Sequence, residues 1–377
     1  MRLPHEHLTA QRMKAPVMRS LNGIQLLNLI GEHGPISRAA LAKLSRLSKP
    51  TVSSQVETLV EQGWVVELGR GESGVKGGKK PTLIQFNANA GRLFAVEINA
   101  VELRMAVSDL EGKILHRAEF RTGEDRRPKA ILDKIRSRLG VLIEREPCDG
   151  LQRAISVASP GRVDVRRGVT LEAGNLFNWG EVPIRSVLED WFSIPVLVDN
   201  DVKMATLGEF HFGLAKGTSD AVVIRLGSGI GSGVVVRGRL WHGRHWAAGE
   251  IAHLLLDLTR AGEDWSVRGY LESMVAPDRV SEAGQEGVVL HLAVAIANMI
   301  CAYDPSIVVL QGEMLAAVAE QLRSLVRRAV PWEVRLEVSQ ISGDAVLLGT
   351  LAAARGLAYE GIARQFDGGR AVAVVGR

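Results

Sequence analysis

The chain has 377 residues, enough for two or three domains, and its apolar content of 46% is ordinary for a globular protein. Its two cysteines, Cys148 and Cys301, are far apart, which excludes a disulfide framework and a cysteine-rich metal site. We find no apolar run of membrane-spanning length and no apolar signal-peptide region, which predicts a cytoplasmic protein with no membrane partner.

The net charge is +4, but it is unevenly distributed. Residues 1–92 hold 13 Lys and Arg against 6 Asp and Glu, a balance of +7, which leaves −3 for residues 93–377. A basic head on a mildly acidic body predicts that the head meets a polyanion.

The basic head has a three-helix pattern. After a loosely ordered lead over residues 1–17, apolar spacing predicts helices over 20–32, over 38–44, and from 49 to just before Gly63. Ser37 and Ser48 are placed to cap the second and third helices. A tight connection before the last helix is typical of a helix-turn-helix. Three helices alone leave a helical interaction domain with a solvated charged face as an equal alternative.

Two short strands around a basic, glycine-rich tip follow at 64–68 and 79–84. They form a plausible wing, which favours a winged helix-turn-helix DNA-binding domain over residues 18–86. Short polar side chains on the third helix can reach base edges, and basic side chains on the wing can contact phosphates at any sequence. The predicted DNA-binding residues are Lys49, Thr51, Ser53, Ser54, Gln55, Arg70, Lys76, Lys79 and Lys80.

From residue 92 the chain alternates between strand and helix patterns. Strands are predicted at 93–98, 102–108, 113–120, 154–157, 195–198, 221–226 and 307–310, and helices at 130–143, 183–192, 288–302, 315–328 and 345–359. This alternation predicts an α/β body over residues 92–377, with two lobes and a cleft between them.

Residues 221–253 hold a glycine-dense turn between two apolar runs, Gly227-Ser228-Gly229-Ile230-Gly231-Ser232-Gly233. Alternate glycines let backbone N–H groups approach a phosphate or a sugar closely. Glu250 and His253 follow and could offer a carboxylate and an imidazole to the same small polar ligand. Taken alone, the stretch is more typical of a hairpin with a flexible turn and a satisfied core histidine.

Several polar motifs occur in one order along the body. They are Ser159-Pro160-Gly161, Asn175-Leu176-Phe177-Asn178-Trp179, Asp199-Asn200-Asp201, Gly227 to Gly233, Ala248-Gly249-Glu250-Ile251-Ala252-His253 and Gly269-Tyr270-Leu271-Glu272. Together they resemble the ROK family (repressors, open reading frames and sugar kinases) over the whole chain. The winged head indicates the NagC/XylR-type repressor branch, because the kinases lack it. The resemblance implies an actin-like, ribonuclease H-like sugar-kinase fold for the body and a homodimer or dimer of dimers.

The resemblance also implies roles for individual residues. Asp201 matches the general base that takes the proton of a sugar hydroxyl in the family's kinases. The sugar-binding positions that it implies are Asn200, Asp201, Glu250, His253 and Glu272, with further contacts at Asn175 and Gly161. Carboxylates and amides suit this role because they form the paired hydrogen bonds that a polyol needs.

The chain departs from the family pattern in two respects. The first concerns the segments that bind the nucleotide in the kinases. The kinases carry an Asp-x-Gly-Gly-Thr phosphate loop, where this chain has Glu97-Ile98-Asn99-Ala100-Val101. A Gly-Gly pair on the nucleotide side is reduced to Gln311-Gly312-Glu313, whose carboxylate would repel phosphate. Loss of preorganised phosphate contacts predicts no useful kinase activity, so Asp201 is a vestigial base.

The second departure concerns zinc, which many family members hold with one histidine and three cysteines. His253 matches that histidine, but residues 258–270 contain no cysteine. A lone histidine cannot build a closed zinc site, so we expect no metal and no cofactor. Packing of Trp265 and Tyr270 is expected to stabilise this segment instead.

These features predict a repressor of carbohydrate uptake or catabolism genes. Its partners would be operator DNA and a sugar or sugar phosphate effector that alters operator affinity. The retained Asp201 leaves open an active ATP-dependent sugar kinase with a DNA-binding appendage. A third alternative, a body that serves dimerisation only, is disfavoured by the intact sugar-binding set.

Overall fold

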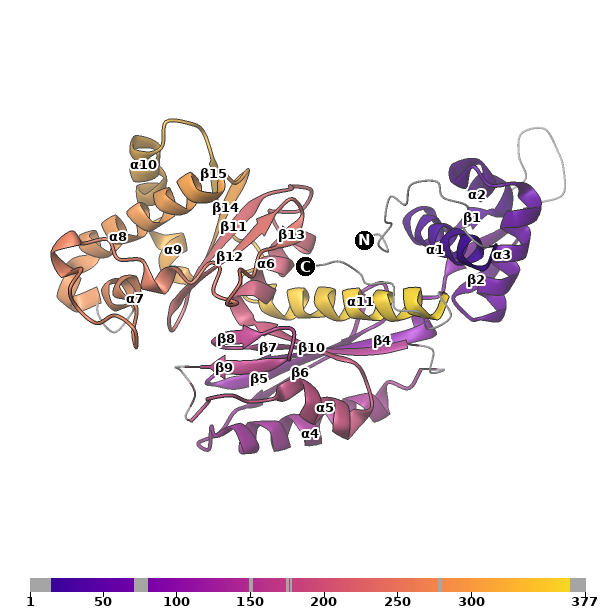
Figure 1. The fold of residues 1–377 in the computed structure, drawn as a ribbon, viewed down its shortest axis with the longest axis horizontal. Coiled ribbons are helices and arrows are strands. Elements are labelled where there is room, and N and C mark those ends of the chain that lie inside the picture. The colour runs from indigo at the N-terminus through magenta and orange to yellow at the C-terminus, as the bar shows by residue number, and fades with distance from the viewer. Residues whose placement is uncertain are drawn as a thin grey trace.

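The computed structural model describes residues 15–70, 81–148, 152–173, 176, 178–276 and 280–366. They form an N-terminal head, two α/β lobes, and a long C-terminal helix that runs from the lobes to the head (Figure 1). The predicted contacts Lys76, Lys79, Lys80 and Asn175 lie outside the described residues.

The head consists of three helices and a small antiparallel sheet of order β1-β3-β2. Its elements are α1 (Ala15–His33), β1 (Ile36–Ser37), α2 (Arg38–Ser45), α3 (Lys49–Glu61), β2 (Val65–Arg70) and β3 (Thr82–Phe86). The side chains of Ser37 and Ser48 accept hydrogen bonds from the backbone N–H groups of Ala40 and Thr51, which confirms both predicted caps.

Lobe 1 is built on a five-stranded mixed sheet of order β10-β7-β4-β5-β6. After the short helix η1 (Ala88–Ala90) come β4 (Gly91–Ile98), β5 (Glu102–Ser108), β6 (Ile114–Arg121), α4 (Pro128–Arg145), β7 (Gln152–Ser159), β8 (Arg162–Asp164), β9 (Val169–Glu172), α5 (Ile184–Phe192) and β10 (Val196–Asn200). Helices α4 and α5 cover the outer face of the sheet (Figure 1). Strand β10 runs parallel to β7 with Asn200 opposite Ser159, so the Asp199 motif lies at the carboxyl edge of the sheet.

Lobe 2 is built on a second five-stranded sheet, of order β13-β12-β11-β14-β15. Its elements are β11 (Ala221–Leu226), β12 (Ile230–Val236), β13 (Arg239–Leu240), η2 (Ile251–His253), η3 (Leu258–Arg260), α7 (Tyr270–Val275), α8 (Val280–Tyr303), β14 (Ile307–Gln311), α9 (Glu313–Ala317), α10 (Ala319–Ala329) and β15 (Arg335–Val338). The buried faces of α8 and α10 form one apolar core with β11 and β14.

Two helices, α6 (Asp201–Phe212) and α11 (Ala345–Phe366), cross each other in close contact beside the lobes. A Cβ on Gly208 would lie 2.1 Å from the carbonyl oxygen of Ala345, and one on Gly349 would lie 1.7 Å from that of Met204. Only glycine fits at such distances, so the two backbones touch directly. Because α6 begins at Asp201, a displacement of this residue would be transmitted to α11.

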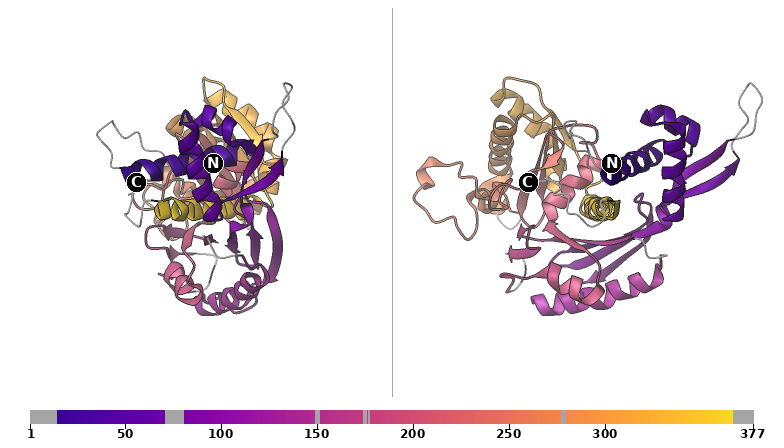
Figure 2. Two further views of the ribbon diagram at one scale, coloured as in Figure 1. Left: turned by 90° about the vertical axis from the view of Figure 1, so that its right-hand side faces the viewer. Right: turned by 45° about the vertical axis from the view of Figure 1, so that its right-hand side comes forward.

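The far half of α11 completes the core of the head. Ala354, Ala358 and Ile362 belong to the same apolar cluster as the buried residues of α1 and α3. Tyr359 stacks on Phe86 of β3 with ring centroids 6.0 Å apart. The right panel of Figure 2 shows α11 almost end-on between the head and the sheet of lobe 1. The head is therefore packed on the body through α11.

Some elements differ from the sequence-based expectation. Helix α8 begins at Val280 and not at 288, because a helix can extend through polar residues before its apolar run. The helix predicted over 315–328 is divided into α9 and α10 at Val318, whose φ of −107° and ψ of 9° are not helical. Helix α11 continues to Phe366, and α6 was not predicted.

Two helical segments are long and apolar enough to cross a membrane, contrary to the sequence-based expectation: residues 286–303 of α8, and α11. About half of each is buried, 50% and 56%. The buried side chains of α8 belong to the core of lobe 2, and those of α11 belong to the cluster shared by the head and lobe 1 and to a small cluster with α6. Core helices commonly have this composition, so the finding is weak evidence for a membrane span.

Candidate functional site

The Asp199 motif lies at the junction of β10 and α6. The Asn200 side chain caps α6 by accepting hydrogen bonds from Val202 N and Lys203 N, at 2.9 and 3.0 Å. Its amide nitrogen donates to the carbonyl oxygen of Gly161 at 2.9 Å and to Asp201 Oδ1 at 3.0 Å. The structure thus brings Gly161, Asn200 and Asp201 together, but the Asn200 amide is occupied by protein partners.

Asp201 is the first residue of α6. Burial of its carboxyl group raises the pKa, which the Arg225 guanidinium and the Val202 N–H oppose and the Glu250 carboxylate reinforces. A buried carboxylate near cationic and anionic neighbours suits a group that binds a hydroxyl proton of a polar ligand.

Some glycines of the glycine-dense turn allow two elements of the fold to pack closely. Residues 227–229 form the tight turn of the β11–β12 hairpin, and Gly231 and Gly233 lie within β12. A Cβ on Gly233 would lie 2.0 Å from Thr206 Oγ1, and one on Gly231 would lie 3.0 Å from Val202. These two glycines therefore let β12 approach α6. They are not part of an open phosphate loop.

Glu250 lies opposite α6 and beside a buried lysine that sequence reasoning missed. Lys203 Nζ is 3.7 Å from Glu250 Oε1 and donates to the carbonyl oxygen of Trp246 at 3.1 Å. The Lys203 side chain is only 2% exposed, whereas that of Glu250 is 36% exposed. Lys203 follows Asn200 by three residues on the same helix, and a lysine within an apolar run was the signal available in the sequence.

Asp199, the first residue of the motif, pairs with a second missed residue. Its Oδ2 is 2.7 Å from His242 Nε2, and its Oδ1 accepts the Asn200 N–H at 2.7 Å. The His242 ring in turn contacts the Trp246 ring edge-on, with centroids 5.7 Å apart. These contacts hold the segment that leads to Glu250 against the start of α6.

Glu272 and His253 are less closely associated with Asp201. The Glu272 carboxylate faces the hairpin turn, 3.4 Å from where a Cβ on Gly229 would lie. His253 is exposed, with Nδ1 3.2 Å from the carbonyl oxygen of Trp265. His253 N donates to the backbone carbonyl oxygen of Glu250 at 3.3 Å, but among the side-chain contacts of the described residues none joins His253 to Asp201 or Glu250.

The segment that matches the family's zinc region is stabilised by aromatic contacts, as expected. The Trp265 and Tyr270 rings meet edge-to-face at 5.3 Å, and the Arg260 guanidinium lies 4.5 Å from the centre of the Trp265 ring. Tyr270 Oη is 3.0 Å from His291 Nε2. Within the described ranges, no group of three His, Cys, Asp or Glu residues is arranged to hold a metal ion.

The turn that the sequence resemblance places at the kinase phosphate loop is closed by its own asparagine. Asn99 Oδ1 accepts hydrogen bonds from Val101 N at 2.9 Å and Glu102 N at 2.8 Å. Backbone N–H groups that could meet a phosphate are thus already bonded. Gly312 has a φ of 119°, and a Cβ there would lie 2.0 Å from the carbonyl oxygen of Leu226, which explains why one glycine remains.

Glu97 lies between this turn and Asp201. It is buried, and burial raises its pKa to about 7, opposed by Arg104 and Arg225 and reinforced by Asp201. Arg104 Nη1 is 3.1 Å from Glu97 Oε2, and Arg104 Nη2 is 2.8 Å from Asp344 Oδ1, just before α11. This ion network joins lobe 1 to the start of the helix that reaches the head.

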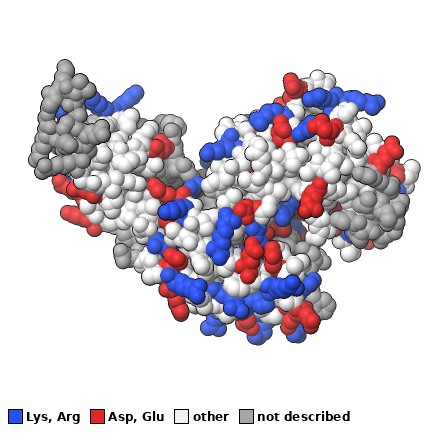
Figure 3. Space-filling view, turned by 180° about the vertical axis from the view of Figure 1, so that it is seen from behind, with Lys and Arg blue, Asp and Glu red and all other residues white. Residues whose placement is uncertain are grey.

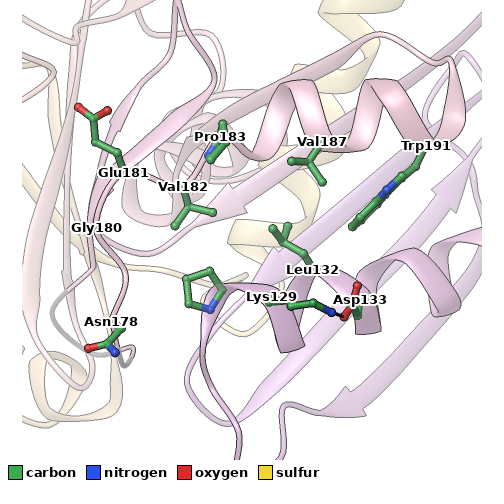
Figure 4. Close-up of a pocket in the computed structure, with 11 residues that line it drawn as sticks. Lys129, Leu132, Asp133, Asn178, Gly180, Glu181, Val182, Pro183, Val187 and Trp191 are labelled. Carbon is green, nitrogen blue, oxygen red and sulfur yellow. Dashed lines mark hydrogen bonds and ion pairs between the residues drawn. The ribbon is translucent and has the colours of Figure 1, made fainter.

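A surface hollow lies elsewhere in lobe 1. A pocket of about 510 Å³ opens between α4 and α5 of lobe 1, floored by Leu132, Val187 and Trp191 and edged by the Lys129–Asp133 ion pair (Figure 4). None of the predicted sugar-binding residues lines it. We therefore do not assign the effector to this pocket.

The predicted DNA-contacting residues on α3 differ in how exposed their side chains are. Lys49 and Ser54 are exposed, and Thr51 Oγ1 is 2.8 Å from the cap residue Ser48. Ser53 is half-buried, and Gln55 points toward α1, with Oε1 3.3 Å from where a Cβ on Gly23 would lie. Gln55 is half-buried and follows the buried Val52 by three residues, so it lies at the edge of the face that packs on α1 and not on the fully exposed face.

The fold and the site together define a two-lobed sugar-kinase-like body joined to a winged helix-turn-helix head. Comparisons with known families agree: the ROK family model matches residues 93–270, and the MarR family model matches residues 21–72. The body of the chain therefore resembles the ROK family, and its head resembles the MarR family.

Several relatives resemble the chain over most of its length. A protein of Caldicellulosiruptor bescii named xylose repressor is 26% identical over 89% of this chain and 96% of its own length. The xylose repressor of Bacillus subtilis is 30% identical over 64% of this chain and 62% of its own length. The Escherichia coli dual regulator NagC is 24% identical over 82% of this chain and 84% of its own length.

Solved structures agree on the fold. A ROK-family transcriptional regulator described as a homologue of E. coli MLC superposes with a TM-score of 0.75 at 20% identity, over 93% of this chain and 99% of its own. A ROK hexokinase of Thermus thermophilus gives 0.60 at 24% identity, over 72% of this chain and 99% of its own. The kinase matches less of this chain than the regulator does.

Proposed function

We propose that the protein is a transcriptional repressor of carbohydrate uptake or catabolism genes. Its head binds operator DNA, and a sugar or sugar phosphate bound by its ROK body alters operator affinity. One contrast carries the proposal: the polar groups around Asp201 and Glu250 are retained, while the phosphate-loop turn is closed by Asn99. The names of the full-length relatives support a repressor that responds to a sugar.

In this proposal, Asp201 and Glu250 bind sugar hydroxyls, with Glu272, His253, Gly161 and Asn175 as further contacts. Asn200 has a positioning role, because its amide is already bonded to Gly161 and Asp201. Lys203 holds the Glu250 carboxylate in place from the buried side. A site that satisfies each hydroxyl in this way rejects sugars lacking one.

The protein has no kinase role in this proposal. Phosphoryl transfer depends on preorganised donors around the phosphates, and here Val101 N and Glu102 N are bonded to the Asn99 side chain. The match of full-length relatives that are named repressors supports the same conclusion.

The proposed coupling runs through α6 and α11. A sugar bound at Asp201 would shift the first turn of α6, and the glycine contact at Gly208 and Gly349 would pass that shift to α11. The stacking of Tyr359 on Phe86 would pass it to the head. The sugar must bind more tightly to one arrangement than to the other for this coupling to operate.

The remaining parts of the proposal concern organisation. Residues 18–86 form the DNA-binding domain and residues 92–377 form the effector and oligomerisation domain. The protein acts in the cytoplasm as a homodimer or a dimer of dimers. A two-fold assembly matches a two-fold operator, because each head then reads one half-site.

The decisive experiment measures operator affinity across a panel of neutral and phosphorylated sugars. The operator fragment is first selected from genomic DNA by binding to the full chain. We expect one class of sugar to weaken DNA binding and to raise the thermal unfolding temperature. Affinity that stays flat across the panel would refute the sensor, and consumption of ATP with a hexose mixture would favour the kinase alternative.

The wing is tested separately by Lys79→Ala and Lys80→Ala in one chain. We expect weaker binding to every DNA sequence and a logarithmic salt slope smaller by about 1.8 for two lost phosphate contacts. Changes at Thr51 or Ser54 should alter sequence preference instead. An unchanged salt slope in the double lysine variant would contradict the wing assignment.

A further inference from the structure

Trp246 has a backbone conformation that favours glycine. Its φ is 62°, in the left-handed region. The other two residues between 241 and 250 with a positive φ are Gly243 and Gly249, at 71° and 83°. A residue with a Cβ is less stable in this region than glycine, and such residues are found preferentially at functional sites. Because glycine would suit the backbone better, the indole side chain is expected to have a role of its own.

The position of Trp246 is fixed by residues of the proposed sugar site. Its carbonyl oxygen accepts a hydrogen bond from Lys203 Nζ at 3.1 Å, and the same ammonium lies 3.7 Å from Glu250 Oε1. The His242 ring meets the Trp246 ring at an interplanar angle of 73°, and His242 Nε2 is 2.7 Å from Asp199 Oδ2. The indole is therefore held by the same groups that hold Glu250.

Lobe 1 contacts the indole from the other side of the site. Gly161, a proposed sugar contact, directly precedes the β8–β9 hairpin. In the turn of that hairpin, the Arg166 guanidinium lies 5.7 Å from the centre of the Trp246 ring. The indole therefore lies where the hairpin that follows Gly161 meets the segment of lobe 2 that carries Glu250.

Arg166 differs from the other charged side chains of lobe 1. In Figure 3, Lys, Arg, Asp and Glu are mixed densely over the lower part of the molecule, where lobe 1 lies. The neighbouring Arg167 follows this pattern and pairs with Glu181 at 3.4 Å. Arg166 is exposed and forms no ion pair with a described residue, and its guanidinium lies over the Trp246 ring instead. An exposed cation–π contact is weak, so a ligand can displace Arg166 from the ring.

We propose that the Trp246 indole is the platform on which the apolar face of the sugar ring packs, so that the site selects a cyclic sugar over an open-chain polyol. The inference rests on the proposed function and names the shape of ligand that its site takes. Asp201 and Glu250 bond hydroxyl groups, which a pyranose and its alditol both present. Only the closed ring holds its C–H groups together on one flat face, which an indole can cover.

The test compares two ligands in the full chain: the effector found in the sugar panel, and the open-chain alditol with the same hydroxyl configuration. Trp246→Gly removes the indole where glycine fits the backbone, so the thermal unfolding temperature should change little. Affinity for the cyclic effector should fall about tenfold, since an aromatic contact of this kind contributes up to about that factor. Affinity for the alditol should stay within about twofold of the wild type, because the hydroxyl contacts remain. Trp246→Phe keeps an aromatic face and should recover part of the loss.

Fluorine-labelled tryptophan gives a direct readout. The chain has 7 tryptophans, and the fluorine resonance that is missing from Trp246→Phe belongs to Trp246. We expect this resonance to shift when the cyclic effector is added. Trp241, in the same segment and 52% exposed, is the matched control. Its resonance should stay in place, and Trp241→Ala should bind the effector like the wild type.

The platform is refuted if Trp246→Gly binds the cyclic effector as tightly as the wild type, or if effector and alditol lose affinity equally. An equal loss in Trp241→Ala would assign the effect to the whole segment and not to the indole. If Trp246→Gly fails to fold, the fluorine shift in the wild type decides. A wild type that binds no sugar of the panel would refute the proposed function, whereas binding with an unshifted Trp246 resonance would refute the platform alone.

Discussion

The polar groups on the two sides of the Asp201 region differ in how far they are occupied by hydrogen bonds within the protein. On the α6 side, the Glu250 carboxylate stays partly exposed and is held by the buried ammonium of Lys203. On the side of the β4–β5 turn, the Asn99 oxygen is bonded to the backbone of its own turn. Both sides are rich in hydrogen-bonding groups, but only the first leaves any of them available. The difference teaches that binding capacity depends on unoccupied donors and acceptors, and not on polar composition.

The largest expected effect is that of Asp201→Ala on the α6 side. We expect effector affinity to fall by about 1,000-fold, equal to about 4 kcal/mol, because a hydroxyl that this carboxylate binds would lose its partner. Isothermal titration with the effector found in the sugar panel measures it. Asp190→Asn on exposed α5 is the control. Retained affinity in Asp201→Ala would place the effector elsewhere.

Glu97, between the two sides, gives a pH dependence. Its carboxyl has an ordinary pKa of 4.5 and a folded-state pKa of about 7, raised by burial. The folded state therefore binds the proton more tightly, and the stability that this gives is complete below pH 4.5 and is lost as the pH rises through 7. Relative to Glu97→Gln, the wild type should lose about 3 kcal/mol of unfolding free energy between pH 4 and 8.

Urea unfolding at several pH values measures this difference. The control is Glu119→Gln, because Glu119 also bonds Arg104, at 3.2 Å, but is exposed. Parallel pH profiles for wild type and Glu97→Gln would show that the carboxyl is not perturbed.

A smaller effect is expected for Lys203→Met, which removes the buried cation. Stability should fall by about 2 kcal/mol, since charged hydrogen bonds contribute about 1.5 to 3 kcal/mol each. Effector affinity should fall about tenfold, because Glu250 would no longer be held in place. Lys203→Arg should restore part of the affinity, and exposed Lys216→Met should change neither quantity. Equal affinity in Lys203→Met and wild type would reduce Lys203 to a packing role.

The smallest effect is expected for Asn99→Ala on the turn. Loss of two side-chain hydrogen bonds should lower stability by about 1 kcal/mol, while effector affinity stays within about twofold of the wild type. Chemical denaturation and titration measure the two quantities, with exposed Asn89→Ala as the control. A large loss of effector affinity would mean that the two sides form one site.

The sequence predicted those parts of the molecule whose patterns are local. The caps at Ser37 and Ser48 were correct because a cap depends on a few neighbouring residues. Helix α6 was missed because Asn200 was interpreted only as a ligand, although its side chain also begins a helix. The long helix over 315–328 was wrong because the break at Val318 follows from packing and leaves no mark in the periodicity.

The sequence also predicted the site only in part, because local patterns do not reveal contacts between distant segments. Motif residues could be named, but their partners come from distant segments, such as His242 for Asp199 and Trp246 for Lys203. The different exposure of Ser54 and Gln55 also depends on how α3 packs on α1. Such contacts form only when the sheet and helices are assembled, so spacing along the chain cannot reveal them.

The packing of α11 on the head has a consequence for synthesis. Residues of the head emerge from the ribosome before Ala358 and Ile362, which complete the core of the head. At about 5 to 20 residues per second, the intervening stretch takes roughly 15 to 55 s to translate. A nascent chain that has not yet reached α11 therefore carries an unfinished head, so competence for DNA is coupled to synthesis of that helix.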